Sequence, residues 1–377
     1  MLRWILFSFA LLLAALSLLT TCQAPDWLPW KTAVVAGEYG YWLIALPVWF
    51  SVLAWRWRRS GRGVAAGTAL LCGVCIAGLL KPSVQAWRIG GSLPGELEQA
   101  FGRVEVKRAP FSPAGFFRGG PAARVAMTHE YAPGRALDFY RAEGRGGSPA
   151  PCVIVVHGGG WDSGDRDQVP QLNHWLAERG YAVAAISYRL APKFQWPAQR
   201  ADTLAALAFL KSRSGELGID PSRFVLLGRS AGGQIAQATG YTAHDAAIRG
   251  VVGLYAPSDL IFGYVNTHEN DMLKSPALMR QFLGGTPESA RANYESASAI
   301  YHVKRTTPPT LLLHGTNDAL VWYRHSVRLD ARLAEAGVPR AYVALPWATH
   351  AFEFNLNGPG GQLTTYALEW FLAAVTR

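Results

Sequence analysis

Residues 223–236 read RFVLLGRSAGGQIA, an apolar run that stops at Gly228 and is followed by Ser230 and further small residues. A short apolar run bounded by turn residues is typical of a buried strand. A Gly-x-Ser-x-Gly corner between a strand and a helix lifts the serine hydroxyl above a sheet, where it can act as a nucleophile. A serine between glycines is also a common turn former, so the rest of the chain has to decide between the chemical and the structural interpretation.

After residue 120 the sequence alternates between apolar runs and segments whose apolar residues have helical spacing. Strands are predicted at 152–156, 181–188, 223–228, 250–255 and 309–315. Helices are predicted at 168–179, 198–213, 231–240 and 323–336. Continuous apolar strands that alternate with helices indicate an α/β fold, with a mostly parallel sheet and helices on both faces. Residues 257–300 interrupt this alternation, and we expect them to form a small cap insertion beside the site.

A serine nucleophile needs a base within hydrogen-bond reach, and the base needs an acid that orients it. After a Gly-x-Ser-x-Gly corner, the acid and then the histidine follow the serine in the chain. TLLLHGTNDALV (310–321) places Asp318 just past a predicted strand, and VALPWATHAFEF (343–354) places His350 in the loop after the next one. We therefore predict Ser230 as nucleophile, Asp318 as acid and His350 as base. Asp259, beyond the strand at 250–255, is the rival candidate for the acid.

The stretch VIVVHGGGWDSGD (153–165) ends a predicted strand in three consecutive glycines. Its spacing matches neither of the glycine-rich motifs that bind phosphates, G-x-x-x-x-G-K-[ST] and G-x-G-x-x-G. Because they lack side chains, Gly159 and Gly160 can turn their N–H groups toward a carbonyl oxygen, and the N–H of Ala231 lies next to the nucleophile. These three residues are the predicted oxyanion hole. Such chemistry needs neither a metal nor an organic cofactor, and we expect none.

The N-terminal region contains three uncharged apolar segments, at 4–21, 39–55 and 64–80. Each is near the lower limit of what spans a bilayer, about 17–25 residues. Three in succession predict a membrane region over 1–80, followed by a Gly-, Pro- and Arg-rich lead-in at 81–120 and a catalytic domain at 121–377. The first segment has two alternative interpretations, a cleaved signal peptide or lipidation at Cys22.

The loops between these segments predict the orientation of the chain. Residues 56–63 contain four arginines, whereas 22–38 contain one lysine. Because positively charged loops stay in the cytoplasm, the third span runs outward. The sequence thus predicts a multi-pass membrane protein in contact with lipid through its N-terminal helices. Its catalytic domain is expected outside the cytoplasm, in the periplasm if the source is Gram-negative.

The formal net charge is +10, but the arginines are scattered along the chain rather than gathered on one element. A nucleic-acid binder concentrates its positive charge, so we expect no nucleic-acid partner. Cys72 and Cys75 have C-x-x-C spacing but lie in an apolar stretch, and Cys152 lies in a predicted strand. We therefore expect no redox or zinc site at Cys72 and Cys75, and we expect Cys152 to be a small hydrophobic residue of the core.

The motifs HGGGW, GRSAGG, HGTND and WATHAF together resemble those of the α/β-hydrolase superfamily. More narrowly, they are similar to the HGGG-type esterases related to hormone-sensitive lipase and the bacterial carboxylesterases, over roughly residues 120–377. The resemblance implies the same roles for Ser230, Asp318 and His350 as those predicted above. One departure is Arg229, which precedes the serine where these families more often have His, Asp or Glu. The combination of spans with a hydrolase domain is also similar to isoprenylcysteine methylesterases.

The resemblance implies a serine carboxylesterase that hydrolyses small-molecule esters, and the apolar N-terminal segments predict that it is anchored in a membrane. Phe262, Tyr264 and Phe282, in the expected cap insertion, favour an apolar acyl or alcohol group. Two alternatives stay open. The same triad serves amide-cleaving relatives such as peptidases and arylformamidases, and the domain could instead be a catalytically inactive binding module.

Overall fold

The computed structural model describes residues 2–59, 61–121 and 127–377. Within these residues, eight strands form a single sheet in the order β1-β2-β4-β3-β5-β6-β7-β8. The strands are β1 (Met127–Ala132), β2 (Arg135–Tyr140), β3 (Ala150–Val156), β4 (Ala182–Ile186), β5 (Ile219–Arg229), β6 (Ile248–Leu254), β7 (Thr310–Gly315) and β8 (Arg340–Leu345). The strands from β4 to β8 are parallel, and β1 and β2 form an antiparallel hairpin at the β4 edge.

Both faces of the sheet are covered by helices because the central strands carry apolar residues on both faces over most of their length. In β3, Ile154 packs into one core, whereas Val153 and Val155 pack into the other. The first core is closed by α6 (Ala198–Ser212), α8 (Ala231–Thr242) and α12 (Arg324–Glu335). The second is closed by α5 (Pro170–Ala177), α13 (Pro359–Val375) and the C-terminal half of α4 (Arg62–Phe101). This arrangement confirms the fold class expected from the sequence.

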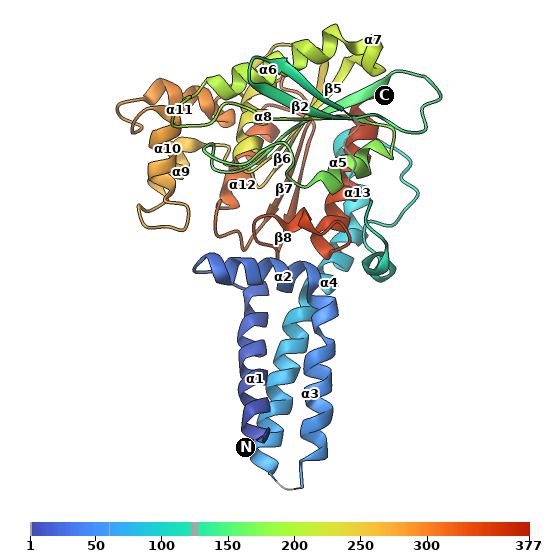
Figure 1. Cartoon of the computed structure of the whole chain (residues 1–377), viewed down its shortest axis with the longest axis vertical. Helices are drawn as coiled ribbons and strands as arrows, with labels where there is room; N and C mark the ends of the chain where they lie inside the picture. The colour runs from blue at the N-terminus through green and yellow to red at the C-terminus, as the bar shows by residue number, and fades with distance from the viewer. Residues whose placement is uncertain (1, 60, 122–126) are drawn as a thin grey trace.

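The segment between β6 and β7 carries three short helices at one side of the sheet (Figure 1). They are α9 (Leu260–Val265), α10 (Ser275–Leu283) and α11 (Arg291–Ala297). We call residues 257–300 the cap segment. The remaining short helices are η1 (Leu18–Thr20), η2 (Pro113–Phe117), α7 (Ser214–Leu217), η3 (Ala299–His302) and η4 (Phe352–Phe354).

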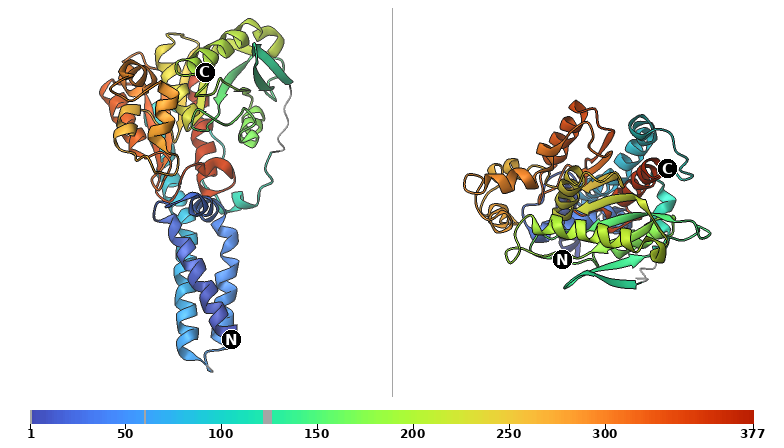
Figure 2. Two further views of the ribbon diagram at one scale, coloured as in Figure 1. Left: turned by 60° about the vertical axis from the view of Figure 1, so that its left-hand side comes forward. Right: turned by 90° about the horizontal axis from the view of Figure 1, so that it is seen from above.

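Below the α/β domain, α1 (Leu2–Ser17), α3 (Ala45–Arg56) and the first half of α4 run side by side and form a stalk (Figure 1). The N-terminus lies at the end of the stalk far from the domain (Figure 2). By length and composition, two helices of the described chain could cross a membrane, or three if the bent pair α2–α3 is one span.

The apolar segment at 39–55 is bent, as its Pro47 predicts: α2 (Trp27–Leu43) lies across the top of the stalk and meets α3 at a bend of 58° (Figure 1). The cause is Pro47, which has no N–H for the carbonyl of Leu43 and whose ring crowds that carbonyl. Residues 81–101, expected as part of an irregular lead-in, instead continue α4, which is 40 residues long.

A buried carboxyl group joins α2 to the α/β domain. Glu38 accepts hydrogen bonds from the indole N–H of Trp347, at 3.2 Å, and from the backbone N–H of Gly360, at 2.8 Å. The backbone carbonyl of Glu38 accepts a hydrogen bond from Asn355 Nδ2 at 2.7 Å. Trp347 precedes His350 by three residues in the same loop, so α2 is attached to the segment that carries the predicted base.

Candidate active site

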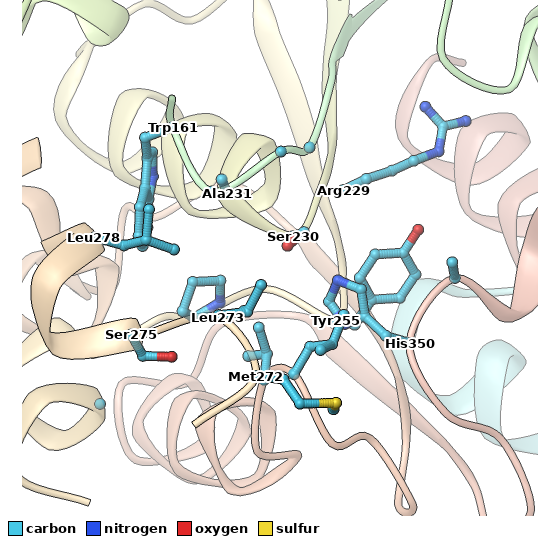
Figure 3. Close-up of a pocket in the computed structure, with 18 of the residues that line it drawn as sticks. Trp161, Arg229, Ser230, Ala231, Tyr255, Met272, Leu273, Ser275, Leu278 and His350 are labelled. Carbon is cyan, nitrogen blue, oxygen red and sulfur yellow. The ribbon is translucent and has the colours of Figure 1, made fainter. Parts of the chain in front are cut away.

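Ser230 stands at the corner between β5 and α8, with φ of 52° and ψ of −123°. A left-handed backbone is uncommon for a residue with a side chain, and such strain persists only where the surroundings enforce it. The glycines of the motif make the corner possible: a Cβ at Gly232 would overlap the carbonyl oxygens of Val156 and His157. The side chain of Ser230 faces a cavity that it shares with His350 (Figure 3).

The structure brings Asp318 and His350 together from loops that follow β7 and β8. His350 Nδ1 lies 2.7 Å from Asp318 Oδ2. The other carboxylate oxygen, Oδ1, accepts the backbone N–H groups of Leu320 at 2.8 Å and Val321 at 2.9 Å. Burial alone would raise the pKa of Asp318, but the neighbouring His350 and His314 outweigh it and hold that pKa well below its usual range. The carboxylate is therefore ionised at neutral pH and can orient the imidazole.

Asp259, the rival acid, has a different role in the structure. It caps the N-terminus of α9, where Oδ1 accepts the backbone N–H of Phe262 at 3.0 Å. Its other oxygen pairs with the guanidinium of Arg328 at 2.8 Å. Among the described residues, the carboxylate that accepts a hydrogen bond from His350 is that of Asp318. The geometry therefore favours Asp318.

The predicted oxyanion donors line the same cavity as Ser230. Gly159 has φ of 120°, and a Cβ there would overlap the backbone of Ser163, so the loop requires glycine at this position. Ala231 begins α8, and the N-terminus of a helix favours developing negative charge. His157 holds the start of the loop: its Nδ1 lies 2.7 Å from the carbonyl oxygen of Gly158, and its ring stacks on Tyr188. Burial lowers the pKa of His157, so this histidine is neutral at neutral pH.

Arg229 departs from the family pattern, and its side chain extends away from Ser230 (Figure 3). Its Nε donates to Glu353 Oε1 at 2.9 Å, in an ion pair that is fully buried. The hydroxyl of Tyr255 donates to the same oxygen, and the Tyr255 ring lies 4.2 Å from the ring of His350. The pair therefore supports the residue that packs against the predicted base. The sequence singled out Arg229 but carried no signal that it pairs with Glu353.

The cavity has a volume of about 540 Å³ and is largely apolar. Its apolar wall comes mainly from the cap segment and neighbouring loops: Leu260, Phe262, Met272, Leu273, Leu278, Met279, Trp322 and Phe354. His325 also lines it, and burial lowers the pKa of His325 to about 3, which keeps the imidazole uncharged. The described residues include no group of three or more His, Cys, Asp or Glu side chains that could hold a metal ion.

The chain matches known proteins over the α/β domain. The family model described as BD-FAE matches residues 137–333, more than half of the chain. "Probable carboxylic ester hydrolase LipM" of Mycobacterium tuberculosis is 30% identical over 239 residues, which cover 60% of this chain and 54% of that protein. "Probable isoprenylcysteine alpha-carbonyl methylesterase ICMEL1" of Arabidopsis thaliana is 28% identical over 251 residues, covering 61% and 51%. The matches thus span about half the length of these two relatives.

Among solved structures, a truncated carbohydrate esterase from gut microbiota superimposes with a TM-score of 0.58 at 22% identity. The superposition covers 69% of this chain and 100% of that one. At this level of identity the likeness establishes the fold of the α/β domain.

Proposed function

Because the chain belongs to the BD-FAE family, we propose that it is a serine carboxylesterase. The observation that carries the proposal is the distance of 2.7 Å between Asp318 Oδ2 and His350 Nδ1, together with a cavity that both His350 and Ser230 line. Esterase and ester hydrolase are the names of the relatives that align over the same domain. The apolar lining of the cavity supports esters with an apolar acyl or alcohol group.

In the proposed reaction, Ser230 Oγ attacks the acyl carbon while His350 Nε2 takes its proton. Asp318 holds the Nδ1–H of His350 and stabilises the imidazolium that forms. The carbonyl oxygen becomes an oxyanion, which accepts hydrogen bonds from the N–H groups of Gly159, Gly160 and Ala231. His350 then returns the proton to the leaving alcohol. A water molecule, deprotonated by His350, attacks the acyl-enzyme. His350 then gives this proton to Ser230 Oγ as the acyl bond breaks, which releases the acid and the free serine.

Hydrolysis of a substrate panel by the purified full chain tests this proposal. We expect turnover of p-nitrophenyl acetate and butyrate, and turnover of acetanilides and formanilides slower by at least about 100-fold, because the apolar wall offers no acceptor for an amide N–H. Faster cleavage of a formanilide would favour the amide-cleaving alternative. Absence of turnover together with absence of labelling by a fluorophosphonate would favour an inactive binding module.

We also propose that the stalk crosses a membrane and that the α/β domain lies outside the cytoplasm. The C-terminal end of α3 and the N-terminal end of α4 lie at the end of the stalk far from the domain (Figure 1). Arg56, Arg58, Arg59 and Arg62 belong to this end. Translocation of four positive charges is costly, so this end stays in the cytoplasm and the opposite end, with the domain, faces outward.

Reporter fusions after Arg377 test the orientation. We expect an alkaline phosphatase fusion, which is active only outside the cytoplasm, to be active, and a green fluorescent protein fusion to be dark. Replacement of the four arginines by glutamine is expected to yield mixed orientations, because the charge asymmetry that sets the topology is removed. A fluorescent fusion combined with an inactive phosphatase fusion would refute the orientation and leave the esterase proposal untouched.

A further inference from the structure

Part of the wall of the cavity that holds Ser230 comes from residues outside the α/β domain. Trp27 and Trp30, in the first turn of α2, line it together with residues of the cap segment. The two indoles contact each other edge to face, with ring centroids 5.6 Å apart. Phe354 and Trp322, both exposed and apolar, line the same cavity from the α/β domain. One side of the cavity is therefore built by the helix that lies across the stalk.

The surface of α2 has the features of a helix at a membrane interface. One face packs on the stalk, through Ala33 and Ala36, and another packs on the domain, through Glu38. A third face is exposed and mostly apolar, with exposed fractions of 75% for Leu28, 43% for Val35, 37% for Tyr39 and 55% for Trp42. Tryptophan and tyrosine concentrate at the depth of lipid headgroups.

The charges of the stalk indicate where the bilayer surface lies. The uncharged part of α4, residues 64–80, is about 25 Å long at 1.5 Å per residue, close to the thickness of a hydrocarbon core. It ends at Lys81, whose Nζ donates to the carbonyl of Thr20 at 2.6 Å. Thr20 precedes Trp27 by only seven residues. Trp27 and Trp30 thus stand at the bilayer surface, between the outer leaflet and the cavity.

The loop before α2 also contacts the predicted acid. Gln23 Nε2 donates to the backbone carbonyl of Asp318 at 3.1 Å. The neighbouring Ala319 packs against the cluster formed by Leu19, Ala24 and Ala33. The loop that carries Asp318 is therefore attached to the outer end of the stalk, which keeps the predicted triad close to the membrane surface.

We propose that the substrate is an ester of a membrane-resident amphiphile, and that it enters from the outer leaflet past Trp27 and Trp30. This inference rests on the proposed esterase function. A long alkyl chain can then pass from lipid to an apolar cavity without crossing water. Each methylene group raises the partition coefficient from water into an apolar environment by a factor of about four. The cavity volume of about 540 Å³ is within the usual range for a ligand with such a chain.

Two esters with the same leaving group separate this route from simple access through water. The full chain is reconstituted in phosphatidylcholine vesicles, and kcat/KM is measured for p-nitrophenyl palmitate in the bilayer and p-nitrophenyl acetate in solution. In the double variant Trp27→Ser, Trp30→Ser we expect the palmitate-to-acetate ratio of kcat/KM to fall by about tenfold or more. Trp27→Phe, Trp30→Phe should restore the ratio, because the rings still offer an apolar rim.

The matched control is Trp49→Ser, Trp55→Ser, which removes two exposed tryptophans of α3 that do not line the cavity. Its ratio should stay within about twofold of the wild type. If the double serine variant does not fold, Trp27→Lys, at a position that is already exposed, replaces it, with the same expected fall in the ratio.

Each outcome bears on one proposal. Wild-type protein that hydrolyses acetate but not bilayer palmitate would refute the membrane route and leave the esterase standing. An equal loss for both esters in the tryptophan variants would also refute it, since the tryptophans would then serve only the fold. If neither ester is hydrolysed and a soluble fluorophosphonate does not label Ser230, the esterase proposal itself fails.

Discussion

Ser230→Ala is expected to reduce kcat/KM for p-nitrophenyl acetate by at least roughly four orders of magnitude. The variant lacks the oxygen that attacks the acyl carbon. No acyl-enzyme can therefore form, although the oxyanion donors remain. The backbone at this position has φ of 52°, a strain that alanine and serine bear alike, so the fold is expected to persist. Initial rates with the purified variant, together with loss of fluorophosphonate labelling, measure the effect.

The control for this variant is Ser212→Ala, in α6, whose hydroxyl donates to the carbonyl of Phe209 within its own helix. This change should leave the rate within about twofold of the wild type. Substantial activity in Ser230→Ala, with the label on a different residue, would show that the corner serine is not the nucleophile.

Asp318→Asn is expected to lower kcat by roughly 10⁴-fold. An amide in place of the carboxylate no longer stabilises the imidazolium, and its NH₂ group favours the wrong tautomer of His350. The distance of 2.7 Å between Asp318 and His350 makes this contact direct. Single-turnover and steady-state rates with p-nitrophenyl butyrate, measured on protein whose unfolding temperature is known, separate lost chemistry from lost stability.

The paired variant is Asp259→Asn, for which we expect kcat within about twofold of the wild type. Asparagine caps a helix as well as aspartate does, so α9 keeps its first hydrogen bond to Phe262. The lost ion pair with Arg328 involves a half-exposed guanidinium and contributes little. Were the two losses reversed, Asp259 would be the acid and the assignment of Asp318 would be wrong.

The central strands were predictable because each contains a continuous run of apolar residues, which is what two covered faces require. The hairpin of β1 and β2 was not predictable, because its polar and apolar residues do not alternate regularly and it lies at the edge of the sheet. The C-terminal half of α4 also escaped prediction. It contains Pro94 and several glycines, which oppose a helix, but burial of Leu93 and Leu97 against the sheet overrides that local preference.

The residues of the candidate site also differ in how far the sequence could predict them. Ser230, Asp318 and His350 could be proposed because each follows a strand and their order along the chain is characteristic. Arg229 and Glu353 are 124 residues apart, and Gln23 and Asp318 are 295 apart. No periodicity or short motif encodes such a contact. The tryptophans of α2 were likewise unpredictable as cavity residues, because only the bend before α3 turns α2 beneath the domain.

The unbroken course of α4, from Arg62 to Phe101, has a mechanical consequence. A flexible tether would let the domain rotate freely above the bilayer. One helix shared by the stalk and the sheet instead fixes both the distance of the domain from the bilayer and its orientation. Each residue inserted after Lys81 would lift the domain by about 1.5 Å and rotate it by about 100°. The number of residues in a single helix thus sets how far Ser230 stands from the membrane and in which direction its cavity opens.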